Sequence, residues 1–223
     1  AVSDTGTVTF SKAASTPNDP SIGVMNAVER LADELGINSE TLLSKTESIV
    51  HGTTVATNAL LERKGAKTGL LTTLGHRDVL EMREGLKDDR YNMRLPAPAP
   101  LVPRYLRLGV RERIKPDGSI HTKLDDASLD EAINKLREEK VTSVAVCYLH
   151  AYKEPKHEQE TKKILEAKLP GVSVSISSEV FPEIKEYERV STTIVNAYVR
   201  PIVENYLNRL EERLKNAGYE GSV

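Results

Sequence analysis

The sequence predicts an α/β protein built from two successive halves, and two observations lead to this prediction. Short apolar runs that suit buried strands alternate along the chain with segments of helical periodicity. Each half also contains a hairpin signal followed by the order helix, strand, which is typical of β-α-β architecture. We expect a mixed sheet with helices on both sides.

Length and composition are those of an ordinary water-soluble protein. The chain has 223 residues, and its 31 basic and 33 acidic residues give a formal net charge of −2, so no long-range field favours nucleic acid or an anionic membrane. The single cysteine, Cys147, lies in an apolar run, which excludes an internal disulfide and favours a buried core thiol. No apolar run is long enough to span a bilayer and no signal-peptide pattern opens the chain, so we expect a cytoplasmic location.

The first half comprises residues 1–87. Residues 6–12 alternate as a strand of a hairpin arm does, and Asp19 followed by Pro20 predicts the start of a helix that Gly36 ends. A strand at 46–52, a helix at about 54–64 closed by Gly65, and a strand at 68–72 then form the expected unit of parallel strands.

A proline-rich connection at 88–105 leads to the second half, residues 106–223. Four prolines deny the connection regular hydrogen bonding, and they favour an extended segment; they are Pro96, Pro98, Pro100 and Pro103. A Pro-Asp-Gly turn at 116–118 between two alternating runs predicts a hairpin from 106 to 123.

Helical and apolar segments complete the second half. Ser128 and Glu131 form a capping-box pattern at the start of a helix. A strand at 141–149, a helix at 154–169 and a strand at 172–176 follow, and two helices at 184–199 and 201–216 close the chain.

The stretch SIVHGTTVATNALLERKG, residues 48–65, is the strongest candidate for a functional site. Here a predicted strand runs into a polar turn and a helix, and α/β proteins bind ligands at such strand ends. The exposed N–H groups of the helix attract phosphate or carboxylate, and the side chains of His51, Thr53 and Thr54 would lie beside them. The alternative is a tight turn whose hydroxyls only cap a helix.

A second polar set lies near the C-terminus. Glu179 and Arg189 could reach a ligand, because an arginine fork suits phosphate or carboxylate, or they could belong to a solvated helix start.

Asn58 is a mid-helix polar residue, so it either bonds to the backbone or faces a cleft. Four histidines show no metal-ligand spacing and are interpreted as isolated surface or capping residues; they are His76, His121, His150 and His157.

Three segments resemble the hydantoinase A and oxoprolinase family. They are HGTTVATNA at 51–59, GAKTGLLTT at 65–73 with GHRDVLE at 75–81, and SEVFPEIKEYERVSTTIVNA at 178–197. The resemblance spans nearly the whole chain, and it implies a ribonuclease-H-like fold of the actin, sugar-kinase and Hsp70 type. Members of this family are ATP-using subunits of hydantoinases, 5-oxoprolinases and acetone or acetophenone carboxylases.

The resemblance implies ATP and Mg²⁺ as cofactors and a hydantoinase B-type partner subunit, with any catalytic metal in that partner. It also implies that His51, Thr53 and Thr54 are catalytic and that Asn58, Glu179 and Arg189 bind substrate or nucleotide. The family's Asp-x-Gly-Gly-Thr phosphate loop is expected before residue 1, and the second wall of the ATP cleft after Val223, so we expect a partial chain.

Three functions remain open from the sequence. The first is the N-terminal region of an enzyme that phosphorylates a cyclic amide oxygen for ring-opening hydrolysis. The second is a ketone carboxylase subunit that applies the same phosphorylation to an enolate. The third, of another class, is a non-catalytic docking module, which the stiff proline segment favours because it orders at little entropic cost on binding.

Overall fold

A computed structural model describes residues 1–85, 89, 91–96 and 98–221, and the backbone forms two compact units. Unit 1 comprises residues 1–56 and 202–223, and unit 2 comprises residues 57–201. Unit 1 therefore combines the two ends of the chain, whereas the predicted halves follow each other in sequence. Part of the expected proline-rich connection, residues 88, 90 and 97, lies outside the described residues.

Unit 2 is built on a four-stranded parallel sheet with the order β2-β1-β5-β6. Its strands are β1 (Thr68–Thr73), β2 (Arg107–Val110), β5 (Ser143–Cys147) and β6 (Ser173–Ile176). Leu70 of β1 is opposite Arg107 and Ala145, and Val144 of β5 is opposite Val174. All strand carboxyl ends therefore lie along one edge of this sheet. The α/β class is confirmed.

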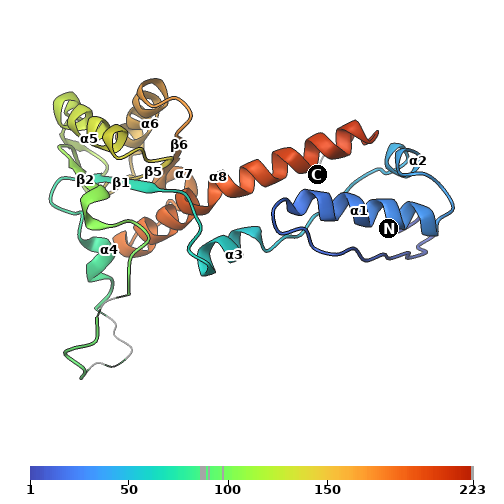
Figure 1. The fold of residues 1–223 in the computed structure, drawn as a ribbon. Helices are drawn as coiled ribbons and strands as arrows, with labels where there is room; N and C mark the ends of the chain where they lie inside the picture. The colour runs from blue at the N-terminus through green and yellow to red at the C-terminus, as the bar shows by residue number, and fades with distance from the viewer. Residues whose placement is uncertain (86–88, 90, 97, 222–223) are drawn as a thin grey trace. The chain divides into compact units, whose positions relative to one another are not determined.

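Helices cover the sheet on two sides. Helices α5 (Asp126–Glu138) and α6 (Lys156–Lys168) lie on one side, and the first part of α8 (Glu186–Asn216) lies on the other (Figure 1). Three short helical turns occur at strand ends and in connections; they are α4 (Val79–Met82), η1 (Arg104–Leu106) and α7 (Ser177–Val180). Every residue of β1 and β5 is buried, as is typical of a parallel strand covered on both faces.

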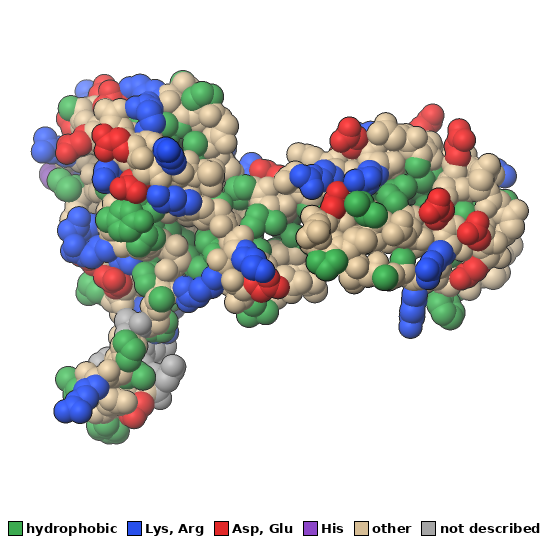
Figure 2. All heavy atoms as spheres, viewed as in Figure 1, with side chains coloured by type: hydrophobic (Ala, Val, Ile, Leu, Met, Phe, Trp, Pro, Cys, Tyr) green, Lys and Arg blue, Asp and Glu red, His purple; other side chains and the backbone are tan. Residues whose placement is uncertain are grey.

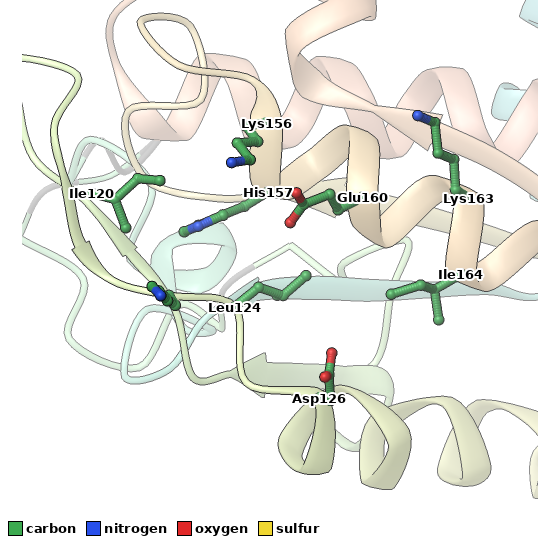
Figure 3. Close-up of a pocket in the computed structure, with 9 residues that line it drawn as sticks. Ile120, Leu124, Asp126, Lys156, His157, Glu160, Lys163 and Ile164 are labelled. Atoms are coloured by element: carbon green, nitrogen blue, oxygen red, sulfur yellow. The ribbon is translucent and has the colours of Figure 1, made fainter.

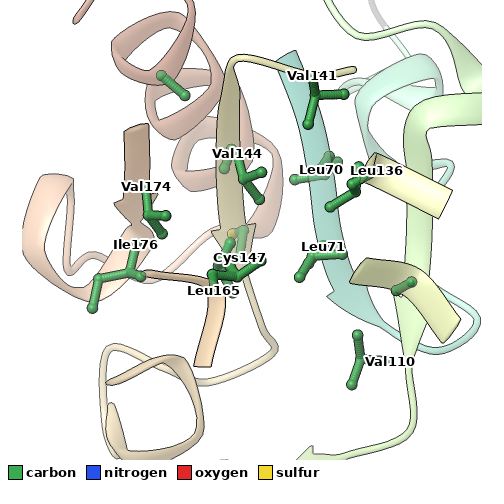
Figure 4. Close-up of a cluster of buried hydrophobic side chains, with 14 of the residues drawn as sticks. Leu70, Leu71, Val110, Leu136, Val141, Val144, Cys147, Leu165, Val174 and Ile176 are labelled. Atoms are coloured by element: carbon green, nitrogen blue, oxygen red, sulfur yellow. The ribbon is translucent and has the colours of Figure 1, made fainter. Parts of the chain in front are cut away.

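The core of unit 2 is aliphatic and well enclosed (Figure 4). Leu71 and Val144 are fully buried, and the predicted stripe of α5 packs against the strands through Leu129, Ile133 and Leu136. Cys147 lies at the end of β5 in this core, where burial raises the pKa of its thiol to about 12. The prediction of a buried core thiol is therefore confirmed.

Unit 1 consists of helices around a small core. Helix α1 (Pro20–Glu34) begins as predicted, with the Asp19 side chain accepting the amide of Ser21 at 3.1 Å. Gly36, with φ of 70°, ends it in the left-handed conformation that favours glycine. Helix α2 (Ser39–Ser44) and the last part of α8 complete the core, which consists of Leu43, Tyr206, Leu210, Leu214 and Tyr219.

Two predicted strands near the N-terminus are wrong. Residues 46–52 have no regular structure, and Val50 is 97% exposed. A strand is stable only beside a hydrogen-bonded neighbour, and the described residues of unit 1 contain no strand ladder next to this segment. The expected hairpin arm is reduced to a single bridge between Val2 and Val8.

The predicted hairpin at 106–123 is partly correct. Its first run forms β2, which joins the parallel sheet, and only β3 (Arg113–Ile114) and β4 (Ile120–Thr122) pair as an antiparallel hairpin. The Pro-Asp-Gly turn connects these two short strands as expected, with the amide of Gly118 bonded to the carbonyl of Lys115 at 2.9 Å.

Three helix boundaries also differ from prediction. Helix α5 starts earlier than the capping box suggests, because Asp125 accepts the amide of Ser128 at 2.9 Å and is the actual N-cap. The two predicted C-terminal helices are one, since α8 continues through Pro201. Helix α3 (Val55–Leu61) ends before Gly65, and Arg63 supplies the positive φ, 52°, that was expected of the glycine.

Acidic and basic side chains are interspersed on the face that Figure 2 shows, in agreement with the small net charge. Among the helices of the described residues, none combines the length and the apolar character needed to cross a membrane.

Candidate functional site

The predicted turn at residues 51–54 is exposed and lies beside the core of unit 1. Gly52, Thr53 and Thr54 are exposed, and His51 is half-buried. The Thr53 hydroxyl accepts the amide of Val55 at 3.3 Å, so this residue caps α3, which is the simpler of the two roles considered for it. The turn is nevertheless exposed to solvent at Gly52, Thr53 and Thr54.

Tyr206 of α8 holds His51 in place. Its hydroxyl lies 2.7 Å from His51 Nε2, and the two ring centroids are 5.7 Å apart. Burial raises the pKa of Tyr206, and a hydrogen bond from Thr53 opposes this shift. The same hydroxyl therefore links His51 and Thr53, and it leaves Nδ1 as the ring nitrogen of His51 that can face a ligand.

The other three predicted site residues lie in unit 2. Asn58 is exposed on α3. Glu179 of α7 forms a surface ion pair with Lys162, with 2.7 Å between Nζ and Oε2. Arg189 of α8 is 1% exposed, and it donates to the carbonyls of Glu183 and Tyr148, both at 3.0 Å. A cleft shared by these residues and the 51–54 turn stays a prediction.

Polar side chains that the sequence analysis did not connect gather at the carboxyl edge of the parallel sheet. The Thr73 hydroxyl at the end of β1 accepts the amide of Leu149 at 3.0 Å and bonds to Oε1 of buried Glu112. Since the Leu149 amide is the donor to Thr73, the Thr73 proton points to Glu112. The other carboxylate oxygen of Glu112 lies 2.8 Å from Nδ1 of His157.

This chain of bonds places a proton on Nδ1 of His157. The Glu112 carboxylate accepts from Thr73 and can only accept from His157 as well, so Nδ1 of the ring is the donor. His157 lines an open hollow of about 550 Å³ between α6 and the segment before α5 (Figure 3). Ile120, Leu124 and Ile164 form its apolar wall, and Asp126 and Glu160 add carboxylates.

Glu158 is a second buried carboxylate at this edge. It accepts the amides of Tyr148 and Ser178 at 2.9 and 2.8 Å and the hydroxyl of Ser177 at 2.6 Å. Burial raises the pKa of Glu158, whereas these three donors oppose that shift. The Glu158 side chain thus connects the segments that follow β5 and β6 to α6 through hydrogen bonds.

Two further histidines at this edge lie near arginine. His76 Nε2 is 3.1 Å from Arg113 Nη1, and because a guanidinium can only donate, His76 accepts this bond as a neutral imidazole. Burial lowers the pKa of His76, and the charge of Arg113 lowers it further. Burial also lowers the pKa of His150. Glu186 opposes this second shift, whereas Arg113 and Arg189 add to it.

The interpretation of these histidines as isolated surface or capping residues is therefore wrong for His76, His150 and His157. The signal that could have found them is position, because Thr73 ends β1, and Glu112 and His150 follow β2 and β5 of the same parallel sheet. The strand-end rule that predicts a site at the turn at 51–54 applies equally to these positions. His121, on the exposed side of the β4 hairpin, remains a surface residue.

Acid is expected to destabilise the protein through His76 and His150. Their folded pKa values lie below the unfolded value of about 6.5, so the unfolded chain takes up protons first as the pH falls through that value. The free energy of unfolding, measured by urea titration at pH 7.5 and 5.5, should therefore fall with acidification.

The double variant His76→Gln/His150→Asn should show a smaller fall than the parent, because asparagine tolerates the positive φ of position 150 and neither new side chain titrates. His121→Gln is the matched control and should keep the parent's pH dependence. An equal fall in the parent and the double variant would contradict the assignment.

Within the part of the chain that the structure describes, no group of three or more His, Cys, Asp or Glu side chains is arranged to hold a metal ion.

Comparisons with known proteins identify a family and several relatives to which the chain is similar. Residues 1–169 match the model of the hydantoinase/oxoprolinase N-terminal region. The chain is 41% identical over 215 residues to the caprolactamase subunit alpha of Pseudomonas jessenii, covering 96% of this chain and 31% of that protein. It is 35% identical over 226 residues to the acetophenone carboxylase gamma subunit of Aromatoleum aromaticum, covering 96% of this chain and 31% of that subunit.

Solved structures agree with the sequence matches. The crystal structure of the ATP-dependent caprolactamase from Pseudomonas jessenii superposes with a TM-score of 0.91 at 40% identity, covering 100% of this chain and 32% of that one. A nucleotide-free acetone carboxylase superposes with a TM-score of 0.84 at 26% identity, covering 94% of this chain and 31% of that one. The chain spans about a third of the length of these relatives. It belongs to the hydantoinase/oxoprolinase family and corresponds to the N-terminal region of its members.

Proposed function

We propose that this chain is the N-terminal region of an ATP-dependent subunit that phosphorylates a cyclic amide oxygen, so that a ring can be opened by hydrolysis. The observation that carries the proposal is the similarity to the caprolactamase alpha subunit, at 41% identity over 96% of the chain with a TM-score of 0.91 for the solved enzyme. Phosphorylation of the amide oxygen removes the amide resonance and makes the carbonyl carbon more electrophilic, so that water can add to it. The C–N bond of the ring then breaks, the amine leaves with a proton, and the phosphate is released by hydrolysis.

The second candidate is a subunit of a ketone carboxylase. It is favoured by the 35% identity to the acetophenone carboxylase gamma subunit and by the TM-score of 0.84 with acetone carboxylase. An enolate oxygen would then accept the phosphoryl group. We prefer the cyclic amide because the identity to the caprolactamase subunit is higher.

The 51–54 turn suits a nucleotide phosphate or substrate oxygen. A Cβ added at Gly52 would meet nothing within 4 Å, so the backbone there is open to close approach. His51, Thr53 and Thr54 would offer donors to a bound phosphate, while Asn58, Glu179 and Arg189 are the remaining predicted binding residues. ATP would supply the phosphoryl group, and Mg²⁺ would be held largely by the phosphates, as is usual for that ion.

A B-type partner subunit belongs to the same proposal, because the relatives are named as alpha, beta and gamma subunits. The alternative from another class, a non-catalytic docking module, would bind such a partner without any ATP chemistry of its own. Any catalytic metal is expected in the partner.

The deciding experiment uses the complete subunit together with its partner subunit. ADP formation and product mass are measured with cyclic amides such as caprolactam, and separately with acetone or acetophenone and bicarbonate. ATP-dependent release of an amino acid supports the first proposal, and ATP-dependent formation of a keto acid supports the second. Assembly with the partner without substrate-dependent ATP use would leave only the docking module.

The 223-residue chain alone is expected not to hydrolyse ATP at a useful rate. Phosphoryl transfer depends on a clamp around the phosphates, and the predicted phosphate loop and opposite wall are not among these residues. Release of phosphate by the purified chain is the measurement. Turnover that disappears in a His51→Ala variant would show that the nucleotide site lies within these residues.

Replacing Thr54 with valine in the complete enzyme removes one hydroxyl at nearly constant size. If Thr54 contacts a phosphate or substrate oxygen, kcat/KM should fall by an amount equivalent to about 1–3 kcal/mol, with far less change in stability. Thr57→Val, one turn later on α3 and also exposed, is the matched control. Full activity of Thr54→Val, or an equal loss in Thr57→Val, would remove Thr54 from the site.

A further inference from the structure

We propose that His76, Arg113 and His150 form a binding site for an oxyanion group of a small ligand, a carboxylate or a phosphate, at the carboxyl edge of the parallel sheet. This site lies in unit 2 and is separate from the 51–54 turn. The proposal does not depend on the proposed ATP chemistry, because it concerns binding by residues within this chain.

The topology brings the three side chains to one edge. His76 follows β1, Arg113 opens the hairpin after β2, and His150 follows β5, while β2, β1 and β5 are neighbours in the parallel sheet. Ligands of open α/β sheets bind at this edge. His76 and Arg113 are in direct contact at 3.1 Å, and all three side chains are only partly buried, so solvent reaches them.

The arginines at this edge form no direct ion pair with the described residues. Within the described part of the chain, neither Arg113 nor Arg189 has a carboxylate at ion-pair distance. Arg189 lies behind the site and is 1% exposed, and its Nε is fully enclosed without a hydrogen-bond partner. A buried guanidinium that bonds only to neutral groups is costly, and an oxyanion nearby would offset that cost.

His150 is held in an unusual conformation. Its φ is 58°, in the left-handed region that non-glycine residues seldom adopt, and its Nδ1 is enclosed without a partner among the described residues. Its ring meets the edge of Tyr152 at a centroid distance of 6.0 Å, and the Arg189 guanidinium lies 5.5 Å from the same Tyr152 ring. Such strain persists where the surroundings fix it, and it is commonly found at binding sites.

The charges around the two histidines favour the binding of an anion. Glu112 is already occupied by Thr73 and His157, and Glu186, the first residue of α8, is the other acidic group that acts on both histidines. When both histidines are neutral, the positive charges of the two arginines equal the negative charges of Glu112 and Glu186, so these groups have no net charge together. An added oxyanion would therefore favour protonation of His76 and His150, so binding should tighten as the pH falls.

The test follows the imidazole signals of the 223-residue chain by NMR while acetate or inorganic phosphate is added at constant ionic strength. The signals of His76 and His150 should shift with saturation, whereas that of exposed His121 should not. Acetate, which does not titrate between pH 8 and 6, should bind several-fold more tightly at pH 6. Preference for acetate assigns a carboxylate ligand, and preference for phosphate assigns a phosphoryl group.

Arg113→Gln should weaken the binding of the preferred anion by roughly tenfold to a hundredfold, the range of a hydrogen bond to a charged group. Arg111→Gln, an exposed arginine two residues earlier, is the matched control and should change affinity less than twofold. His76→Gln provides a second variant if Arg113→Gln unfolds, and it should weaken binding at pH 6 more than at pH 8. No saturable shift, a parallel shift of His121, or an equal effect of Arg111→Gln would overturn the proposal.

Discussion

Replacing Glu158 with alanine is expected to lower the free energy of unfolding by about 3–5 kcal/mol, the range seen when a buried hydrogen-bonded charge is removed from its partners. Glu158 is fully buried and accepts two amides and one hydroxyl. Alanine would leave these donors without an acceptor in a site that water does not reach, and each unsatisfied donor costs on the order of 1–3 kcal/mol.

The matched control is Glu166→Ala, an exposed glutamate two turns later on the same helix α6, which should change stability by less than about 0.5 kcal/mol. Urea titration followed by circular dichroism measures both variants. Glu158→Gln should lose less than Glu158→Ala, since its amide oxygen still accepts while its NH₂ group faces a donor. Equal stability of the parent and Glu158→Ala would contradict the role of this side chain.

Gly65→Ala is the second substitution with a large expected effect. A Cβ built at Gly65 would lie 2.1 Å from Cε1 of Tyr198, a ring that is 7% exposed and cannot move away freely. The adjacent backbone is also fixed, because the Ala66 amide bonds to the Tyr198 carbonyl at 2.9 Å. Overpacking of this kind costs about 1–3 kcal/mol of stability.

A double-variant cycle checks the cause. Tyr198→Leu removes the ring, so Gly65→Ala should cost less in the Tyr198→Leu background than in the parent, and the difference is the coupling between the two positions. Gly52→Ala, where an added Cβ meets nothing within 4 Å, is the stability control. If Gly65→Ala cost the same in both backgrounds, the close approach of Tyr198 would not be its reason.

The sequence predicts those elements whose signals are local. The buried strands at β1, β5 and β6 follow from continuous apolar runs, and the Asp19-Pro20 start of α1 follows from capping chemistry. Each of these features depends on residues within one segment. That is why the predicted positions agree closely with the observed bounds.

The predictions are wrong where the local structure depends on residues that are far away in the sequence. The run at 46–52 has the composition of a strand but finds no strand to pair with among the described residues. The run at 107–110 pairs with β1 instead of with its own hairpin. Gly65 is explained by a tyrosine 133 positions away, not by the helix end beside it. Pro201 does not end α8, although local rules place a break there.

The candidate site shows the same division. His51 and Thr53 were predicted from a local motif, but the hydroxyl that links them belongs to Tyr206 on α8. The pairing of Glu112 with His157 joins residues from a hairpin and a distant helix, and no spacing rule connects them. The sequence suggests Arg189 as a fork for a ligand oxyanion or as part of a solvated helix start. In the structure its buried guanidinium donates to two backbone carbonyls, and ligand binding by Arg189 stays a prediction.

Cys147 gives the protein an internal reporter of its own dynamics. It is the single cysteine of the chain, it is 4% exposed, and its raised pKa leaves almost no reactive thiolate at neutral pH. An alkylating reagent can therefore modify it only in molecules whose central strand β5 has separated from its neighbours. The rate of alkylation in native buffer then measures how often that separation occurs, without any engineered label.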